Sequence, residues 1–268
     1  NTGVQVTKTE RDMVVTAKYK GLAGNHIHVI FKKQVETGFE VTTVFFGKEV
    51  DKQIITALPF KNDYVNVTGT LTTEDKTILL EGGTDGATTN SEVEDFLNAL
   101  DTQDFRVLAL GTDESATKAL VTAHIKKWRD AGRSVIAVLN DYTDADDEGV
   151  VSVGNGVTLS DGTKLSAKDC VYFVAGKYAG AGLQSNTFKS YPGAIDCERK
   201  NEAEAEKLIN KGQLIFAYRN EKVIILSDVN SFTSYTAEHS RIFGKNKLVR
   251  TMDNINSNVK YIFENYFI

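Results

Sequence analysis

The stretch "FRVLALGTDESATKALVTAHIKKWRDAGRSVIAVLN", residues 105–140, decides the fold class. Its first six and last eight residues are short apolar runs, typical of buried strands. Between them, apolar residues recur at helical spacing until Gly132, a residue that commonly ends helices. Two buried strands joined by a helix form a β-α-β unit, so the sequence predicts an α/β core.

Further elements extend this core on both sides. A helix is predicted over 91–101, another from Ser166 in "SAKDCVYFVAGKYAGAGLQ", and an acidic one in "CERKNEAEAEKLINKG", residues 197–212. The runs "QLIFAY" and "KVIILS" flank "RNE" and predict a hairpin, which gives the core an antiparallel edge. We therefore predict an α/β core domain with a mixed sheet at residues 86–233.

The two ends of the chain differ from this core. Alternating, β-branched segments from Val4 to about Gly83 predict a β-rich domain at residues 1–85, a sandwich or a barrel. Residues 234–268 include a long amphipathic helix and are assigned to the start of a helical C-terminal domain. Its apolar stripe needs a partner, and we expect part of that partner beyond Ile268, in a longer protein of which these residues are a piece. This stripe comprises Leu248, Val249, Met252, Ile255, Val259, Ile262 and Phe263.

Bulk composition argues against two classes of partner. The net charge of -5 and the pI near 5.5 give no general attraction to nucleic acid or anionic lipid. The sequence has no uninterrupted apolar run of about 18 residues and no apolar centre of a secretion signal near its start. Cys170 and Cys197 are too few for a disulfide scaffold, and we expect both to be free thiols.

Candidate chemical sites are weak. In "DADDEG", Asp144, Asp146 and Glu148 alternate as in a calcium loop, but the closing carboxylate position falls on Asn155. His26 and His28 share a strand face without a third ligand nearby. Since phosphate loops and nucleophile elbows are also absent from the sequence, we predict no catalytic residues, no metal and no cofactor.

Several phrases in a fixed order carry a resemblance over nearly the whole chain. They are "KYKGLAGNHIHV", "LLEGGTDG", "VVSVGNGVTLSDGTKL", "YPGA" and "VNSFTSYT", the last leading to "KNKLVRTMDNINSNVKYIFENYFI". The sequence thereby resembles contractile phage tail sheath proteins, in the form found in PBSX-like defective prophages and R-type bacteriocins.

The resemblance implies a structural subunit and not an enzyme. Such subunits stack as hexameric rings around an inner tube and contract to drive that tube through a target cell envelope. It also implies that the β-rich domain is an insertion, and that the partners are other sheath subunits and the tube protein. The expected location is a virion tail or bacteriocin particle assembled in the bacterial cytoplasm.

Two groups near the C-terminal segment are candidate contacts. We expect Asp228, Asn230, Ser231 and Ser234 to cap turns and the next helix, which would lock the core to a tube-proximal domain beginning near Tyr235. A small basic group could dock an acidic tube or neighbouring subunit, and the alternative is a solvated helix end. This group comprises Lys245, Lys247 and Arg250.

Two hypotheses from other classes remain open at this stage. One is an α/β hydrolase-like or nucleotide-dependent enzyme, against which the missing phosphate loop and nucleophile elbow count. The other is a β-rich adhesin, which a binding partner for residues 1–85 would support.

Overall fold

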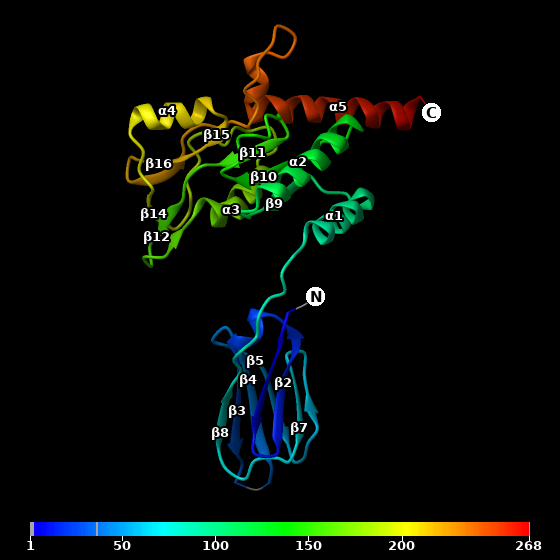
Figure 1. Ribbon diagram of the computed structural model, residues 1–268, viewed down its shortest axis with the longest axis vertical. Coiled ribbons are helices and arrows are strands. Elements are labelled where there is room, and N and C mark those ends of the chain that lie inside the picture. Colours follow the sequence, from blue (N-terminus) through cyan, green and yellow to red (C-terminus); the bar gives the residue numbers. More distant parts are fainter. Residues whose placement is uncertain (1–2, 36, 268) are drawn as a thin grey trace. The chain divides into compact units, whose positions relative to one another are not determined.

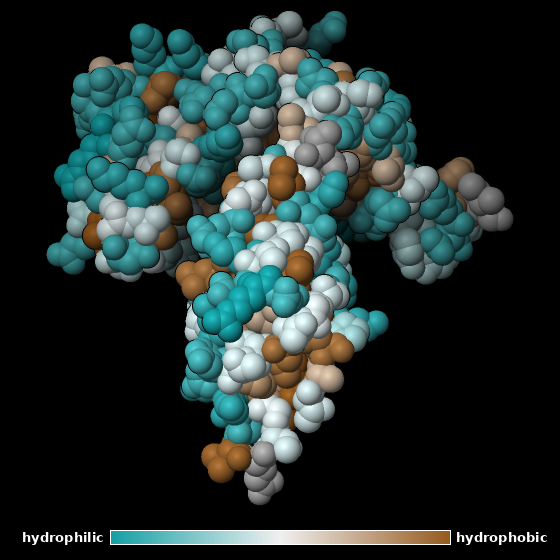
Figure 2. Space-filling model, turned by 60° about the horizontal axis from the view of Figure 1, so that its bottom comes forward, coloured by the Kyte–Doolittle hydropathy of each residue, from teal (hydrophilic) through white to brown (hydrophobic). Residues whose placement is uncertain are grey.

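The structure is a computed structural model that describes residues 3–35 and 37–267, and it divides into two compact units, residues 1–89 and 90–268 (Figure 1). The predicted fold class, α+β with several sheets, is confirmed. No helix in the described ranges is long and apolar enough to cross a membrane. Most of the surface visible in Figure 2 is hydrophilic or intermediate, and hydrophobic residues appear there in small separate groups.

The first unit is a β-sandwich, which resolves the choice between sandwich and barrel. Two antiparallel four-stranded sheets contribute alternate residues to one core, in which Val15, Val29 and Phe31 are fully buried. One sheet has the order β1 (Gln5–Glu10), β2 (Met13–Lys20), β7 (Val65–Gly69), β6 (Phe60–Lys61). The other has the order β5 (Lys48–Ile55), β4 (Phe39–Phe45), β3 (Ile27–Lys33), β8 (Lys76–Leu79).

A parallel sheet forms the centre of the second unit, as the β-α-β pattern predicts. Its order is β15 (Gln213–Leu214), β11 (Val150–Val153), β10 (Ile136–Asn140), β9 (Val107–Leu110). Helix α2 (Ser115–Asp130) packs on one face of this sheet and α3 (Ala167–Gly180) on the other. β10 is buried throughout because its residues alternate between these two helices.

The prediction of an antiparallel edge, which would make the central sheet mixed, is wrong, because the antiparallel strands pair with one another outside this parallel sheet. β16 (Phe216–Arg219) and β17 (Lys222–Ile225) form a separate hairpin. The run "QLIFAY" is therefore split, since β15 joins the central sheet and β16 leaves it. A second small sheet, unassigned from the sequence, has the order β13 (Lys164–Leu165), β12 (Val157–Leu159), β14 (Ala194–Cys197).

The remaining helices complete the second unit. α1 (Asn90–Ala99) precedes the central sheet, and α5 (Asn246–Tyr266) is the predicted long C-terminal helix. The acidic helix was predicted from residue 197, but α4 begins at Glu202 and ends at Asn210. The physical reason is a capping box: Asn201 accepts from the Glu204 backbone N–H, while the Glu204 side chain accepts from that of Asn201.

Both cysteines are free and buried in the same core, Cys170 on α3 and Cys197 at the end of β14. Burial raises the pKa of Cys170 to about 11 and also raises that of Cys197, so little thiolate forms at neutral pH. We expect the folded, unreduced protein to resist an aromatic disulfide reagent at pH ~8, and both thiols to react after unfolding. Failure to recover either thiol after unfolding would mean that the two are joined in a disulfide.

Candidate functional site

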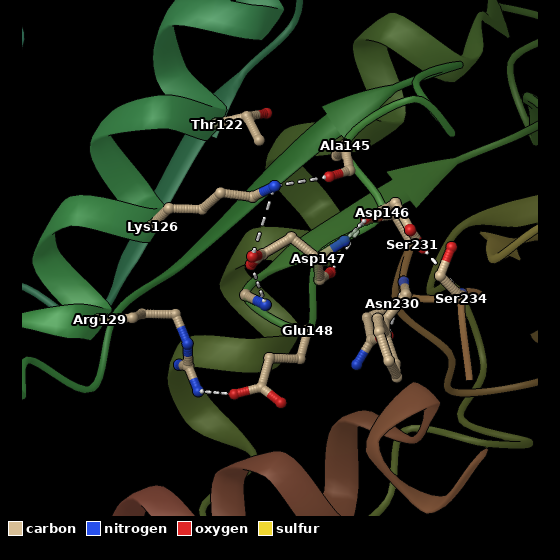
Figure 3. A network of polar contacts seen from close by, with 12 residues as sticks. Thr122, Lys126, Arg129, Ala145, Asp146, Asp147, Glu148, Asn230, Ser231 and Ser234 are labelled. Carbon is tan, nitrogen blue, oxygen red and sulfur yellow. Dashed lines mark hydrogen bonds and ion pairs between the residues drawn. The ribbon is translucent and has the colours of Figure 1, made fainter. Parts of the chain in front are cut away.

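The loop after β10 is held by the segment that follows β17. The Asp146 carboxylate accepts a hydrogen bond from the backbone N–H of Ser234 at 3.0 Å (Figure 3). It also accepts from the backbone N–H of Thr233 at 2.7 Å and from the Thr233 hydroxyl. Burial alone would raise the pKa of Asp146, but the hydrogen bonds from Ser234 and Thr233 outweigh burial and lower it. A charged carboxylate therefore ties two segments that lie far apart in the sequence.

Ser231 strengthens the same junction. Its buried hydroxyl donates to the Asp147 carbonyl oxygen at 3.0 Å and accepts from the Asp147 backbone N–H at 3.2 Å. The Ser231 backbone N–H donates to the carbonyl oxygen of Val150 at 2.8 Å. Ser231 is thus hydrogen-bonded both to the loop after β10 and to the first residue of β11.

Arg129, on α2, connects this loop to α5. Its guanidinium donates to Glu148 at 2.9 Å and to both carboxylate oxygens of Asp253 at 2.9 and 3.0 Å. Burial would lower the pKa of Arg129, but Asp253 and Glu148 outweigh it and raise the pKa. We call the residues that join α2, the β10 loop, the segment after β17 and α5 the polar seam: Arg129, Asp146, Asp147, Glu148, Ser231, Thr233 and Asp253.

A second polar group, the Asp228 cluster, lies at the start of α5. We define it as Tyr178, Asn186, Asp228, Asn246 and Arg250. The Asp228 carboxylate accepts from the Tyr178 hydroxyl at 2.5 Å and from the Asn186 backbone N–H at 2.8 Å. Arg250 lies 3.6 Å from the same carboxylate, and Asn246 donates to the Tyr178 hydroxyl at 2.6 Å. Burial, together with the Asp228 charge, raises the pKa of Tyr178 well above its usual value.

The predicted capping role of the segment at 228–234 is correct only in part. Asn230 does cap a turn, since its side-chain oxygen accepts from the Phe232 backbone N–H at 3.1 Å. The next helix, however, has Lys245 at its N-cap without any side-chain cap hydrogen bond. Asp228 and Ser231 bind the α/β core instead, because buried polar groups inside the core supply nearer partners.

The three basic residues of the candidate contact group have different surroundings. Lys245 and Lys247 are exposed. The Arg250 side chain is only 10% exposed, and its guanidinium donates to the carbonyl oxygens of Gly182, at 2.8 Å, and Gln184. Arg250 is therefore engaged within the unit, and a contact role for the two lysines stays a prediction.

Two of the three carboxylates of the calcium-like loop, those of Asp146 and Glu148, are engaged by neighbouring side chains and backbone, while Asp144 is exposed. Asp146 accepts from Thr233 and Ser234, and Glu148 pairs with Arg129 and with His239 at 3.1 Å. Within the described residues, no group of three or more His, Cys, Asp or Glu side chains could hold a metal ion. Asn155 is buried and bonds the backbone of Glu198 and Phe216.

We therefore expect calcium at millimolar concentration to leave the melting temperature unchanged. A ligand that binds only the folded protein would raise this temperature by mass action. Thermal unfolding with and without calcium tests this expectation, with magnesium as the control for ionic strength and charge. A rise that only calcium produces would contradict it.

Helix α5 presents its apolar side away from the unit. Its polar residues Arg250, Asp253 and Ser257 face the body, and Ser257 lies 3.2 Å from the hydroxyl of Ser134. Large apolar residues on the other side are 40–74% exposed. We call this set the α5 stripe: Leu248, Met252, Ile255, Val259, Ile262, Phe263 and Tyr266.

Sequence reasoning missed Arg129, Asp253, Tyr178 and Asn246 as joining residues. One signal was available, since Arg250, Asp253 and Ser257 recur at helical spacing opposite the apolar residues. Periodicity identifies two faces of a helix, but it does not say which one contacts the rest of the unit.

Comparisons with known proteins identify a family and relatives of this chain. A family model described as "Phage tail sheath protein central domain" matches residues 86–231. The phage-like element PBSX protein XkdK of Bacillus subtilis (strain 168) is 37% identical over 273 residues, covering 91% of this chain and 58% of that protein.

Solved structures share the fold. The sheath tail protein of Desulfitobacterium hafniense is 36% identical with a TM-score of 0.85, and the alignment covers 99% of this chain and 66% of that one. The helical sheath of the anti-feeding prophage, solved in its contracted state, is 13% identical with a TM-score of 0.52, covering 71% of this chain and 55% of that one. This last similarity concerns the fold alone.

Proposed function

The chain belongs to the phage tail sheath protein family, and on that premise we propose that it forms part of a structural subunit of a contractile tail sheath. In this proposal the complete protein assembles as stacked hexameric rings around an inner tube. Contraction of the rings then drives the tube through a target cell envelope. The observation that carries the proposal is the family match over 86–231, which spans the parallel sheet, α2 and α3.

The polar seam supports a mechanical role. A sheath subunit must move as one body, because a contracting assembly transmits force from each subunit to its neighbours. Ion pairs and buried hydrogen bonds tie α2, the β10 loop and α5 together in the second unit. Such contacts resist the relative sliding of elements, since moving one partner leaves buried charges unpaired.

We infer that the protein is structural and not catalytic, as members of a sheath family are expected to be. Its proposed partners are other sheath subunits and the inner tube protein. Lys245 and Lys247 are exposed and could contact an acidic surface of either partner. The proposed location is a virion tail or bacteriocin particle, with assembly in the bacterial cytoplasm.

The assembly state tests this proposal. We expect the 268-residue chain to be a monomer in dilute solution and the complete sheath protein to polymerise into rings or tubes. In cohesion by terminal arms, extended segments of one subunit add strands to the sheet of a neighbouring subunit. Without such arms only contacts between compact bodies remain, and contacts that bury less than about 800 Å² in total are usually weak. Light scattering after size exclusion distinguishes the two states. A stable hexamer of the 268-residue chain would show that arms are not needed.

A further inference from the structure

The exposed residues of the α5 stripe follow a coiled-coil spacing. Six of them are separated by four, three, four, three and four positions: Leu248, Met252, Ile255, Val259, Ile262 and Tyr266. Apolar residues that alternate between spacings of three and four positions lie on one narrow line along a helix. We call this line the apolar seam of α5. At about 1.5 Å per residue this seam is about 27 Å long, which matches a second helix of about five turns.

The polar contacts of α5 keep its apolar seam facing away from the unit. The bidentate ion pair between Asp253 and Arg129 and the Ser257 contact lie on the opposite side of the helix. Turning the stripe toward the unit would break this ion pair and leave charges without partners. The helix therefore cannot cover its own apolar side by rotating, and the cover has to come from elsewhere.

The residues that border the apolar seam of α5 are uncharged. Thr251, Asn258 and Asn265 border one side, while Asn256 and Phe263 border the other. Flanking positions of coiled coils often carry charges that select a partner. Here selection rests on apolar packing, so the matching partner is an amphipathic helix with the same three-four repeat and without a strongly charged border.

We propose that the α5 stripe packs against an amphipathic helix from the part of the longer sheath protein that lies outside these 268 residues. The alignment covers 99% of this chain but only 66% of the Desulfitobacterium hafniense chain, and only 58% of XkdK. At least a third of each of these proteins therefore lies outside the aligned region. The α5 stripe offers that part of the protein a long apolar surface with a defined repeat.

A second copy is the less suitable occupant. Two copies that pair through the same stripe form a closed twofold dimer, and such a dimer does not extend into rings. This choice of occupant rests on the proposed sheath function. Its test therefore uses the thermal stability of the protein and the concentration dependence of protection, which can be measured whether or not rings form.

The experiment compares two substitutions on α5 in two proteins. Val259 lies in the stripe and Tyr261 on another side of the helix, and each is 60% exposed. In the 268-residue chain we expect Val259→Asp and Tyr261→Asp to have equally small effects on the melting temperature. In the complete sheath protein we expect Val259→Asp to lower it by about 5 °C or more, because a charge then enters an apolar contact.

Hydrogen exchange of α5 tests whether the helix that covers the α5 stripe belongs to the same molecule or to another copy. We expect protection of the α5 amides in the complete protein to be independent of protein concentration. Equal effects of the two variants in the complete protein would overturn the proposal, and so would protection that grows with concentration. A dimer of the 268-residue chain that Val259→Asp dissociates would identify a second copy as the occupant. If Val259→Asp prevents folding of the complete protein, Val259→Ala and Tyr261→Ala provide the same comparison with a smaller effect.

Discussion

Replacement of Asp228 by alanine is expected to lower the free energy of unfolding by about 3–5 kcal/mol, because it removes one partner of a buried ion pair. Asp228 is 3% exposed, and its carboxylate accepts from the Tyr178 hydroxyl and the Asn186 backbone N–H. Without it, these donors lose their acceptor, and the Arg250 charge remains in a site where its side chain is 10% exposed. Urea unfolding followed by circular dichroism measures the change.

Tyr178→Phe is the matched control for this cluster. It deletes one hydroxyl but leaves the Asp228 carboxylate and the Arg250 charge in place. We expect a loss of about 1.5–3 kcal/mol, the usual range for a hydrogen bond to a charged group, and therefore less than for Asp228→Ala. Equal losses for the two variants would show that the carboxylate contributes only through the Tyr178 hydroxyl, contrary to our account of the Asp228 cluster.

Arg129→Met is expected to cost about 2–4 kcal/mol, somewhat less than loss of a fully buried charge. The Arg129 side chain is 12% exposed, and its partners Glu148 and Asp253 are 26% and 20% exposed. The variant keeps apolar contacts of the arginine stem but takes the guanidinium away from both carboxylates, and Glu148 retains its contact with His239. Because Asp253 lies on α5, we also expect faster hydrogen exchange at the α5 amides.

Lys127→Met controls for the loss of a positive charge on the same helix. Lys127 pairs with Asp101 at 3.2 Å, and its side chain is 59% exposed. Exposed ion pairs contribute about 0–1 kcal/mol, so this variant should change stability little. If Arg129→Met has no larger effect than Lys127→Met, the polar seam does not hold α5 in place.

Local patterns predicted the centre of the second unit well. The runs around 105–110 and 133–140 became β9 and β10, with α2 between them, because strands covered on both faces are apolar throughout. α4 begins later than the acidic run predicts because Asn201 and Glu204 form a capping box, which fixes the first turn of the helix. The separation of β15 from β16 was missed, since a continuous apolar run gives no sign that a chain changes sheets.

The polar contacts were much harder to predict than the elements. Asp146 binds Thr233 across 87 positions of sequence, and Arg129 binds Asp253 across 124. Such pairs depend on how distant elements pack, and no local period encodes them. The family, in contrast, was identified from phrases that occur along nearly the whole chain, and the match over 86–231 confirms that identification.

Cryo-electron microscopy of the complete sheath protein tests the central claim most directly. We expect tubes of stacked sixfold rings, with density in each subunit that accepts the second unit as one body and keeps α5 attached through Arg129 and Asp253. Tubes in an extended and a shorter, wider state would support contraction. Dispersed subunits under all conditions, or assemblies without sixfold rings, would contradict the account.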